Sequence, residues 1–304
     1  MQSENIDALK DGLRDHPAKR AHLRYRLKHA NVYVSRGGYH FSDALDPVNE
    51  ISPEIDASQL TREESTYIET QLQANAQRFR HQVDVLKKYL PLRNAKVLDI
   101  GCGGGLFLSL LKQEGAQTTG IELSDSRAHY AATKHNLDIY KHPVESDFWQ
   151  KGYKEYFDAV TLWDVVEHVN YPFQTLESAR NVLMKGGLLL VDTPCRDSFY
   201  HRVGEMTYRV SGGRFPTFLN AMYSSHRFGH KQIFSTSEMK ELFRSCGLEV
   251  IELRKFHELS FPYEFYLRTL LRSEALVKLS LPAVKAFFRL FKIRNKMLVI
   301  GRKI

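Results

Sequence analysis

The chain has 304 residues, of which 43% are hydrophobic and 26% are charged, and its formal net charge at pH 7 is +8. This composition is typical of a folded globular protein and excludes a disordered or fibrous chain. Lys and Arg outnumber Asp and Glu by 20 to 9 in residues 196–304 and by 8 to 4 in residues 1–40, whereas the middle of the chain is acidic. The basic ends indicate either an anionic partner or a solvated basic surface.

Three cysteines (Cys102, Cys195 and Cys246) are an odd number and include no CxxC pair, which excludes a disulfide framework and a zinc site of that kind. The polar stretch from Met1 to Lys28 lacks the apolar region of a secretory signal. No run of about 18 apolar residues is present to span a bilayer. We therefore expect a cytoplasmic protein, either free in solution or peripheral to the inner face of a membrane.

Residues 1–60 show weak periodicity and are predicted to be an irregular, basic extension. Thr61 and Glu64 then form a capping-box pattern, and apolar residues recur at helical spacing until Pro91. This predicts one long amphipathic helix or two shorter ones. The apolar residues are Tyr67, Ile68, Leu72, Phe79, Val83, Leu86 and Leu90.

From Lys96 onward, short apolar strands alternate with helices of about 10 residues. The alternation predicts an α/β fold: a doubly wound, mostly parallel seven-stranded sheet with helices on both faces. Strands are expected at 96–100, 117–121, 137–140, 157–163, 188–193, 248–254 and 296–300, and helices at 106–113, 125–135, 173–184 and 236–246. Two insertions interrupt the pattern, a cap at 195–233 and an amphipathic helical segment at 257–295. The predicted core domain is therefore 61–256 with 296–304.

A glycine-rich turn, Asp99-Ile100-Gly101-Cys102-Gly103-Gly104-Gly105, follows the first of these strands. Such a turn lies at the ligand-binding edge of a doubly wound sheet, and its glycines let the backbone approach a ligand closely. Leu106 stands where a dinucleotide fingerprint needs a small residue, and no P-loop lysine follows. Asp99 would repel phosphate but suits an ammonium and a sulfonium. Glu122, at the end of the next strand, is placed to accept hydrogen bonds from a ribose. Together they indicate S-adenosylmethionine.

These motifs resemble those of the class I, seven-stranded S-adenosylmethionine-dependent methyltransferases. The resemblance covers about residues 80–255 and the last strand. The matching segments are Val97–Gly105, Gly120-Ile121-Glu122, Phe157–Val160 leading into Trp163–Val169, and Leu183–Leu188. The ending Glu167-His168-Val169 and the segment His230–Phe234 resemble the subgroup of ubiquinone-biosynthesis O-methyltransferases.

The resemblance assigns roles by position. It implies that the methionine moiety contacts Asp99, Gly101, Gly103, Gly105 and Asp164, that the ribose contacts Glu122, and that the adenine lies between Val144 and Glu145. Leu123, next to Glu122, is also expected to bind the cofactor. Ordinary solvation in a loop is the alternative for Glu145 and Asp164.

Methyl transfer needs an aligned nucleophile and a group that removes its proton. The candidate bases are His168, His226 and His230, which equally suit a structural tie between cap and sheet. In a second interpretation Asp164, Glu167 and His168 share one helical face and, with His226 or His230 as a fourth ligand, hold Mg²⁺, Mn²⁺ or a similar ion. Many methyltransferases with this Glu-His ending bind no metal.

The two insertions carry the signals for the acceptor. Aromatic residues and arginines in the cap are suited to stacking on bases or sugars, to lining an apolar tunnel, or to a small satellite core. Residues 257–295 alternate apolar and basic residues, which predicts an amphipathic helix pair broken at Leu281-Pro282. This pair suits an anionic membrane surface; alternatively it covers a sheet edge or a dimer interface.

The sequence thus predicts an O-methyltransferase that uses S-adenosylmethionine and acts on a small-molecule, sugar or lipid-linked, quinone- or phenol-like acceptor. An RNA 2′-O-methyltransferase and a non-catalytic scaffold of the same fold are the alternatives. No RNA-binding module is visible, so a nucleic-acid partner is not expected, and the intact glycine turn with Glu122 argues against a scaffold. The sequence leaves the oligomeric state open.

Overall fold

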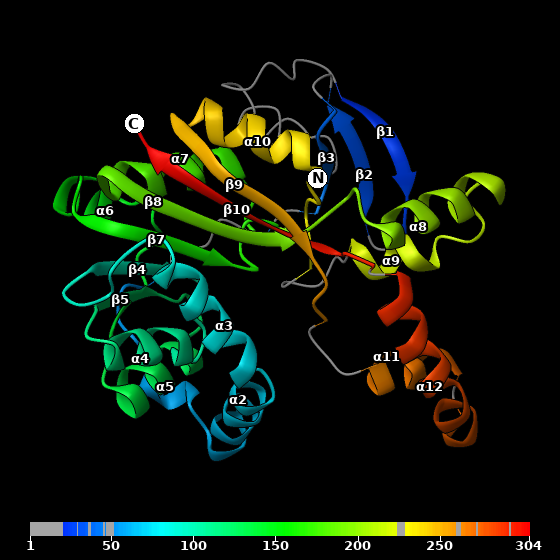
Figure 1. Cartoon of the computed structure of the whole chain (residues 1–304), viewed down its shortest axis with the longest axis horizontal. Helices are drawn as coiled ribbons and strands as arrows, with labels where there is room; N and C mark the ends of the chain where they lie inside the picture. The colour runs from blue at the N-terminus through cyan, green and yellow to red at the C-terminus, as the bar shows by residue number, and fades with distance from the viewer. Residues whose placement is uncertain are drawn as a thin grey trace.

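The computed structural model describes residues 21–28, 30–35, 38–44, 46, 52–223, 229–259, 263–271, 273–291 and 293–304 (Figure 1). Its centre is a seven-stranded sheet in the order β6-β5-β4-β7-β8-β10-β9. The strands are β4 (Lys96–Ile100), β5 (Gln117–Ile121), β6 (Asp138–Tyr140), β7 (Phe157–Trp163), β8 (Leu183–Pro194), β9 (Leu248–Phe256) and β10 (Lys296–Lys303). β10 is antiparallel to β8 and β9, and the other neighbours are parallel. The predicted doubly wound, mostly parallel sheet is confirmed.

Helices cover both faces of this sheet. One face carries α3 (Ala76–Lys87), α4 (Leu106–Gln113) and α5 (Asp125–His135), and the other carries α6 (Asp147–Gly152), α7 (Pro172–Val182) and α10 (Thr236–Ser245). Adjacent residues of β8 point to opposite cores: Leu190 belongs to the core that contains Phe107 of α4, whereas Leu189 belongs to the core that contains Trp149 and Leu176. Strands buried on both faces explain the unbroken apolar runs in the sequence.

The segment between Thr61 and Pro91 forms two helices, α2 (Arg62–Ala74) and α3, which meet at Asn75. The Thr61 hydroxyl accepts a hydrogen bond from the Glu64 backbone N–H at 3.1 Å, so Thr61 caps the helix as predicted. Most other elements match the expected bounds within two residues. The strand expected at 188–193 begins earlier, at Leu183, and α6 had no sequence signal.

The expectation of an irregular N-terminal extension is wrong for its described part. Three antiparallel strands, β1 (Ala21–Arg26), β2 (Asn31–Ser35) and β3 (His40–Ser42), form a separate small sheet. Its apolar face is completed only by tertiary contacts, since Tyr25 and Val32 pack against Leu219, Tyr223 and Ile233 of the cap. Short polar strands of this kind give little periodic signal by themselves.

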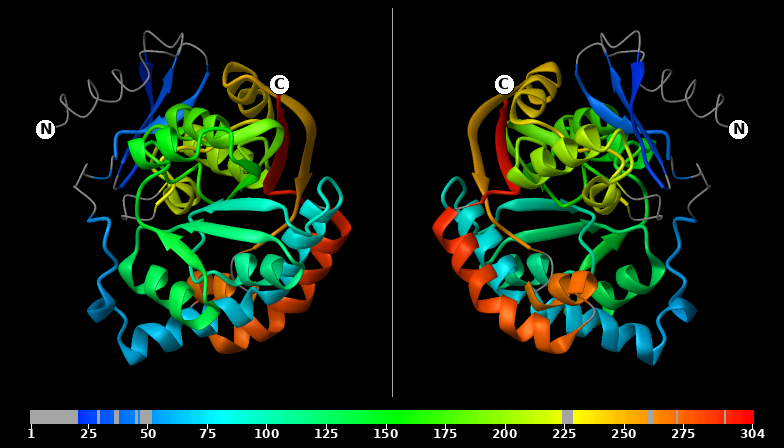
Figure 2. Two further views of the ribbon diagram at one scale, coloured as in Figure 1. Left: turned by 90° about the vertical axis from the view of Figure 1, so that its left-hand side faces the viewer. Right: turned by 90° about the vertical axis from the view of Figure 1, so that its right-hand side faces the viewer.

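Both insertions contain helices. The cap holds α8 (Phe199–Val210) and α9 (Thr217–Met222). Residues 257–295, called the arm below, hold α11 (Tyr263–Leu271) and α12 (Glu274–Phe291). In Figures 1 and 2 the arm extends away from the sheet, on the side opposite β1–β3. Among the described residues, no helix is both long and apolar enough to cross a membrane.

The break expected at Leu281-Pro282 is wrong, because α12 continues through Pro282. A proline inside a helix removes one backbone hydrogen bond and often bends the helix. Here contacts on the far side of Pro282 hold α12 against α11: Lys285 pairs with Glu264 at 3.0 Å, and the Phe288 and Tyr263 rings lie 5.0 Å apart. The break lies instead between Leu271, where α11 ends, and Glu274, where α12 begins.

Candidate cofactor and acceptor site

The glycine turn follows β4 at the carboxyl edge of the sheet, between β5 and β7. Gly103 has a φ of +55°, and a Cβ placed on it would meet no atom within 4 Å. Its neighbour Gly104 is crowded, because a Cβ there would come within 2.9 Å of Ile68 and Leu72 on α2. The turn is therefore covered by α2 on one side and leaves open space beside Gly103.

Glu122 borders this open space. One carboxylate oxygen accepts the backbone N–H of Gly103 at 2.8 Å, and the other accepts the N–H of Ser124 at 2.9 Å. Both bonds fix the direction of the carboxylate, and each oxygen retains a further lone pair for a ligand hydroxyl. This position agrees with the role expected for Glu122, and Leu123 beside it is 44% exposed.

Asp99 lies beneath the turn and is almost inaccessible to solvent. Its carboxyl group accepts a hydrogen bond from the Thr161 hydroxyl at 2.6 Å. Burial raises the pKa of Asp99 to about 8, and the bond from Thr161 only partly offsets this effect. Its contact with the methionine moiety stays a prediction, and the group that would make it is a neutral carboxyl at pH 7.

The two residues expected to flank the adenine differ in exposure, and Glu145 is exposed to solvent. Val144 is buried in the core, and the carboxylate of Glu145 accepts a hydrogen bond from the Thr175 hydroxyl on α7. Neither position contradicts a contact with the adenine, and both stay predictions.

Asp164 belongs to a group of five charges that we call the charge cluster: Arg78, Asp164, Asp192, Glu258 and Lys296. Lys296 Nζ lies 2.6 Å from Asp164 Oδ1 and 3.0 Å from carboxylate oxygens of both Asp192 and Glu258. Arg78 on α3 lies 2.5 Å from Asp164 and 3.0 Å from Glu258. Two cations thus hold three carboxylates at the ends of β7, β8 and β9.

The cluster shifts the titration of its members. Lys296 and Arg78 outweigh the burial of Asp164 and hold the pKa of its carboxyl well below the usual range. Burial raises the pKa of Asp192 to about 6, because its opposing attraction to Lys296 is smaller. Asp164 also has a φ of +53°, and its backbone N–H donates to Asp192 at 2.7 Å. The cluster therefore fixes an unusual backbone conformation beside the glycine turn.

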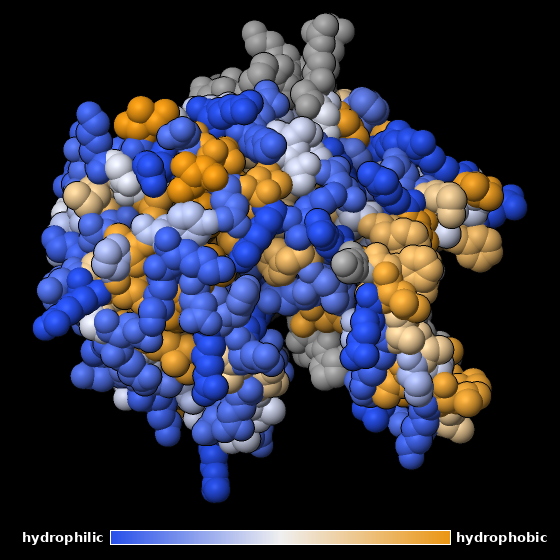
Figure 3. Space-filling model, viewed as in Figure 1, coloured by the Kyte–Doolittle hydropathy of each residue, from blue (hydrophilic) through white to orange (hydrophobic). Residues whose placement is uncertain are grey.

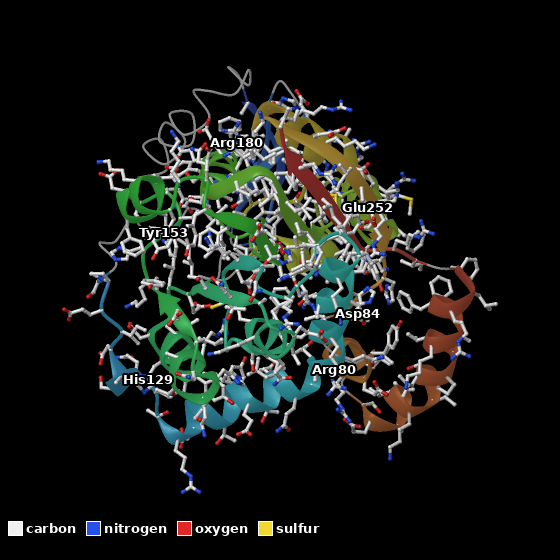
Figure 4. All side chains as sticks on the ribbon, turned by 60° about the vertical axis from the view of Figure 1, so that its left-hand side comes forward. Arg80, Asp84, His129, Tyr153, Arg180 and Glu252 are labelled. Carbon is white, nitrogen blue, oxygen red and sulfur yellow. The ribbon has the colours of Figure 1, made fainter. Side chains whose placement is uncertain are left out.

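Sequence reasoning missed Arg78, Asp192, Glu258 and Lys296. Asp192 directly follows the apolar run Leu188–Val191 near the end of a strand, and that signal was available. Arg78 had no such signal in the sequence. It lies on α3, which also exposes Arg80 and Asp84, labelled in Figure 4. Lys296 and Glu258 are brought to the site by the antiparallel pairing of β10 with β8 and β9.

Glu167, His168 and His230 form a second group, next to the charge cluster. One ligand atom from each lies within 4.8 Å of the others, and Glu167 Oε1 is 3.9 Å from His168 Nε2. Buried Glu167 Oε1 and His230 Nδ1 have no hydrogen-bond partner among the described residues. Burial lowers the pKa of His168, lowers that of His230 to about 4, and raises that of Glu167 well above its usual value.

Two expectations about this group need correction. Residues 164–168 form a turn and not a helical face, and Asp164 is engaged by Lys296 and Arg78 instead of joining Glu167 and His168. The carboxyl of Glu167 accepts a bond from the Thr193 hydroxyl, and its backbone oxygen accepts bonds from Lys231 and Gln232. The segment after His230 thus ties the cap to the sheet. His226 lies outside the described residues.

The open space at Gly103, the oriented Glu122 carboxylate and the absence of a phosphate-binding lysine define a cradle for a nucleoside that bears a cationic amino acid. The family model of the methyltransferase domain matches residues 70–253. The chain belongs to the methyltransferase domain family, and it is an S-adenosylmethionine-dependent methyltransferase of class I.

The similar proteins agree with this assignment. A ubiquinone biosynthesis O-methyltransferase of Stutzerimonas stutzeri is 30% identical over 175 residues, covering 57% of this chain and 72% of that protein. One from Saccharophagus degradans is 28% identical, covering 52% of this chain and 65% of that protein. A solved S-adenosylmethionine-dependent methyltransferase of Thermotoga maritima has a TM-score of 0.50 at 21% identity and covers 79% of this chain and 96% of its own. Several other relatives are matched over only about half of their length, 44% to 48%.

Proposed function

We propose that the protein transfers a methyl group from S-adenosylmethionine to a hydroxyl oxygen of a small-molecule acceptor. The oxygen acceptor is supported by the names of the relatives matched over residues of the methyltransferase core. The observation that carries the proposal is the adjacency of the Glu122 cradle, on β5 and β4, to the ionisable groups at the ends of β7 and β8. The bound cofactor supplies a methyl group already activated by its sulfonium.

The chain's own residues have separate tasks in this reaction. Glu122 would hold the ribose, and Asp99 would lie under the methionine end. His168 is the base that the geometry favours, because its Nδ1 lies 3.2 Å from the Gly229 carbonyl oxygen. Since that oxygen can only accept, Nδ1 carries the proton and the lone pair is left on Nε2. Burial lowers the pKa of His168, which keeps the imidazole neutral at pH 7 and leaves Nε2 free to accept a proton.

A direct assay tests this function. The purified chain and S-adenosylmethionine with an isotopically labelled methyl group are incubated with a panel of phenols, catechols and hydroxylated sugars. We expect label on an acceptor oxygen, and a loss of about 10² to 10⁴ in rate for His168→Ala. Label found only on nitrogen or carbon would exclude O-methylation, and an unchanged rate in His168→Ala would exclude this residue as the base.

A divalent ion is the second candidate role for the same histidine. Glu167 Oε1 and His230 Nδ1 have no hydrogen-bond partner among the described residues, and one ligand atom from each of Glu167, His168 and His230 lies within 4.8 Å of the others. Two imidazoles with one carboxylate fit a divalent first-row metal or, less well, Mg²⁺. An ion there would polarise an acceptor hydroxyl. Because Nε2 cannot bind a metal and a proton together, calorimetric titration of the chelator-treated protein with Mg²⁺ and Mn²⁺ distinguishes the two roles. Saturable binding that His230→Ala removes would assign the metal.

The acceptor is proposed to be lipid-linked, with the arm, residues 257–295, bringing the enzyme to an anionic membrane surface. The support is the arm's own make-up, two amphipathic helices with exposed cations Lys278, Lys285 and Arg289. Sedimentation with anionic vesicles at increasing salt tests it. Binding should fall as salt rises, and a protein that stays in the supernatant at low salt would contradict it.

A further inference from the structure

Exposed apolar side chains are concentrated on the cap and on α12. Ten of the sixteen large hydrophobic side chains exposed in the described part of the chain lie in residues 199–218 and 276–291. A soluble monomer rarely gathers exposed apolar surface in this way unless a partner covers it. Scattered exposure would need no explanation, so the clustering is the observation to account for.

On α12 these side chains form a stripe along the outer face. Its members recur at helical spacing: Leu276, Leu279, Phe287 and Leu290. Leu279 and Leu290 are each 77% exposed. The inner face is already occupied, since Val277 is buried and Phe288 packs against Tyr263 of α11. Helix α12 therefore has a second apolar face that α11 does not cover.

The cap also has an exposed apolar face and a packed inner side. Its exposed members are Phe199, Met206 and Val210 on α8, followed by Phe215 and Phe218. The inner side of α8 is packed, because His201 is buried beside Tyr223 and Gly204 lies against Leu219. The exposed residues of α8 are thus a separate face and not the edge of the small core beneath the cap.

The two elements are held together at the carboxyl edge of the sheet. The ring of Tyr200 on α8 stacks on Phe288 of α12 with centroids 5.8 Å apart, and Phe288 also stacks on His257. The cap follows β8 and the arm joins β9 to β10, so both begin at the edge that carries the charge cluster. Figure 3 shows hydrophobic residues over both elements along the right-hand margin of the molecule.

Both the cap and α12 carry positively charged side chains. Residues 199–222 and residues 274–291 each contain three Lys or Arg and one Glu. Among the described residues, no ion pair engages the exposed cations Arg202 and Arg214 of the cap or Lys278 and Arg289 of α12. Exposed apolar stripes bordered by unpaired cations match the chemistry of an anionic lipid surface.

We propose that the exposed sides of α8, α9 and α12 are one bipartite docking face for an anionic bilayer, in which the cap contributes an attachment separate from the arm. This inference rests on the proposed membrane-bound acceptor and extends the contact beyond the arm. A second copy of the chain fits less well, because an isologous contact would place like cations of the two copies against each other. Two linked attachments bind more tightly than either alone.

The docking face also sets the orientation of the enzyme. Because cap and arm both start at the carboxyl edge, binding through the two together turns the charge cluster and the group of Glu167, His168 and His230 toward the bilayer. A lipid-linked acceptor would then reach the site without leaving the membrane.

Vesicle flotation with single substitutions tests the proposal. Met206→Asp on α8 and Leu279→Asp on α12 each place a negative charge on one half of the face, and both positions are exposed enough to leave the fold intact. Ile304→Asp is the matched control, since Ile304 is 74% exposed but lies outside the face. The vesicles contain phosphatidylcholine alone or mixed with phosphatidylglycerol.

We expect the wild type to float with the mixed vesicles and not with phosphatidylcholine alone. Each substitution should weaken partitioning about tenfold, the two together about a hundredfold, and the control should match the wild type. If Met206→Asp floats like the wild type, the cap is not part of the face and the proposal is wrong. It is also wrong if the wild type does not float, or if it is a dimer in ultracentrifugation that these substitutions dissociate.

Calorimetric binding of S-adenosylmethionine is measured for every variant. Variants that bind the cofactor but do not float support the docking face. A wild type that floats without binding the cofactor would leave the docking face standing and refute the proposed function, so the two failures are distinguishable.

Discussion

Cofactor binding should be coupled to the loss of a proton from Asp99. In the free protein burial raises the pKa of Asp99 to about 8, roughly 4 units above an ordinary aspartate, which corresponds to about 6 kcal/mol in favour of the neutral form. At pH 7 about nine tenths of the molecules therefore hold this proton. A cationic methionine moiety beside Asp99 favours the carboxylate, so the bound state has the lower pKa and binding releases the proton.

The direction of the pH dependence follows from this release of a proton on binding. Affinity should rise with pH to a maximum near pH 8, above which the cofactor's α-amino group loses its charge, and it should change about 20-fold between pH 6 and pH 7.5. Within this range the α-amino group of the cofactor, with a pKa of about 7.8, stays mostly protonated. Calorimetry at pH 7 in buffers of different ionisation enthalpy should show a net release of about 0.8 proton per cofactor bound, because Asp99 loses about 0.9 proton and the α-amino group takes up about 0.1.

Two variants separate Asp99 from other titrating groups. Asp99→Asn should remove the proton release and flatten the pH dependence. Thr161→Val removes the hydroxyl that donates to Asp99 at 2.6 Å, so it should raise the pKa of Asp99 further and move the pH dependence to higher pH. Wild-type binding without proton release, or an equal slope in Asp99→Asn, would refute the reasoning.

Three further predictions concern the cradle and the packing around it. Gly103→Arg should abolish cofactor binding in calorimetry by filling the open space beside Glu122, at a backbone strain of about 1 kcal/mol. Lys296→Met leaves three buried or half-buried carboxylates facing one remaining cation, and should lower the free energy of unfolding by about 3 to 5 kcal/mol in urea titrations. Ser235→Ala removes the hydroxyl half of the capping box of α10 and should lower the free energy of unfolding by about 1 kcal/mol.

Each of these three predictions has a control variant. Gly186→Arg has the same kind of positive φ and open surroundings as Gly103 but lies at the opposite edge of the sheet, so it should leave cofactor binding intact. Equal losses in both variants would attribute the effect to the backbone. Lys296→Arg keeps the charge and should be much milder than Lys296→Met, and Thr217→Ala on α9 is a comparison for Ser235→Ala without a capping bond to lose. Stability unchanged by Lys296→Met would mean that the charge cluster contributes nothing to folding.

The sheet and the cofactor half of the site were predictable because their signals are local. Strands β4, β5 and β7 and helices α4 and α5 begin and end where apolar periodicity and turn residues predicted. The glycine turn and Glu122 lie at ends of adjacent parallel strands, so knowing the strand positions was enough to bring them together. These parts depend on residues close in sequence or on a topology with few alternatives.

The acceptor half was not predictable to the same degree. Arg78 and Asp164 are 86 positions apart, and Lys296 and Asp192 are 104 apart. No periodicity connects such residues, and the antiparallel insertion of β10 between β8 and β9 places Lys296 at the site. The alternative in which Asp164 joins Glu167, His168 and His230 as a metal ligand could not be judged from the spacing for the same reason, because Arg78 and Lys296, which engage Asp164, are distant in sequence.

The sequence by itself determined the class of fold, the cofactor and the residues of the glycine turn, since these follow from short-range patterns of apolar residues, glycines and carboxylates. The tertiary structure alone decided the rest: the N-terminal sheet, the continuity of α12 through Pro282, the charge cluster, and the joining of cap and arm through Tyr200 and Phe288. The physical reason is that burial and electrostatic pairing depend on distances in space, which the order of residues along the chain does not specify.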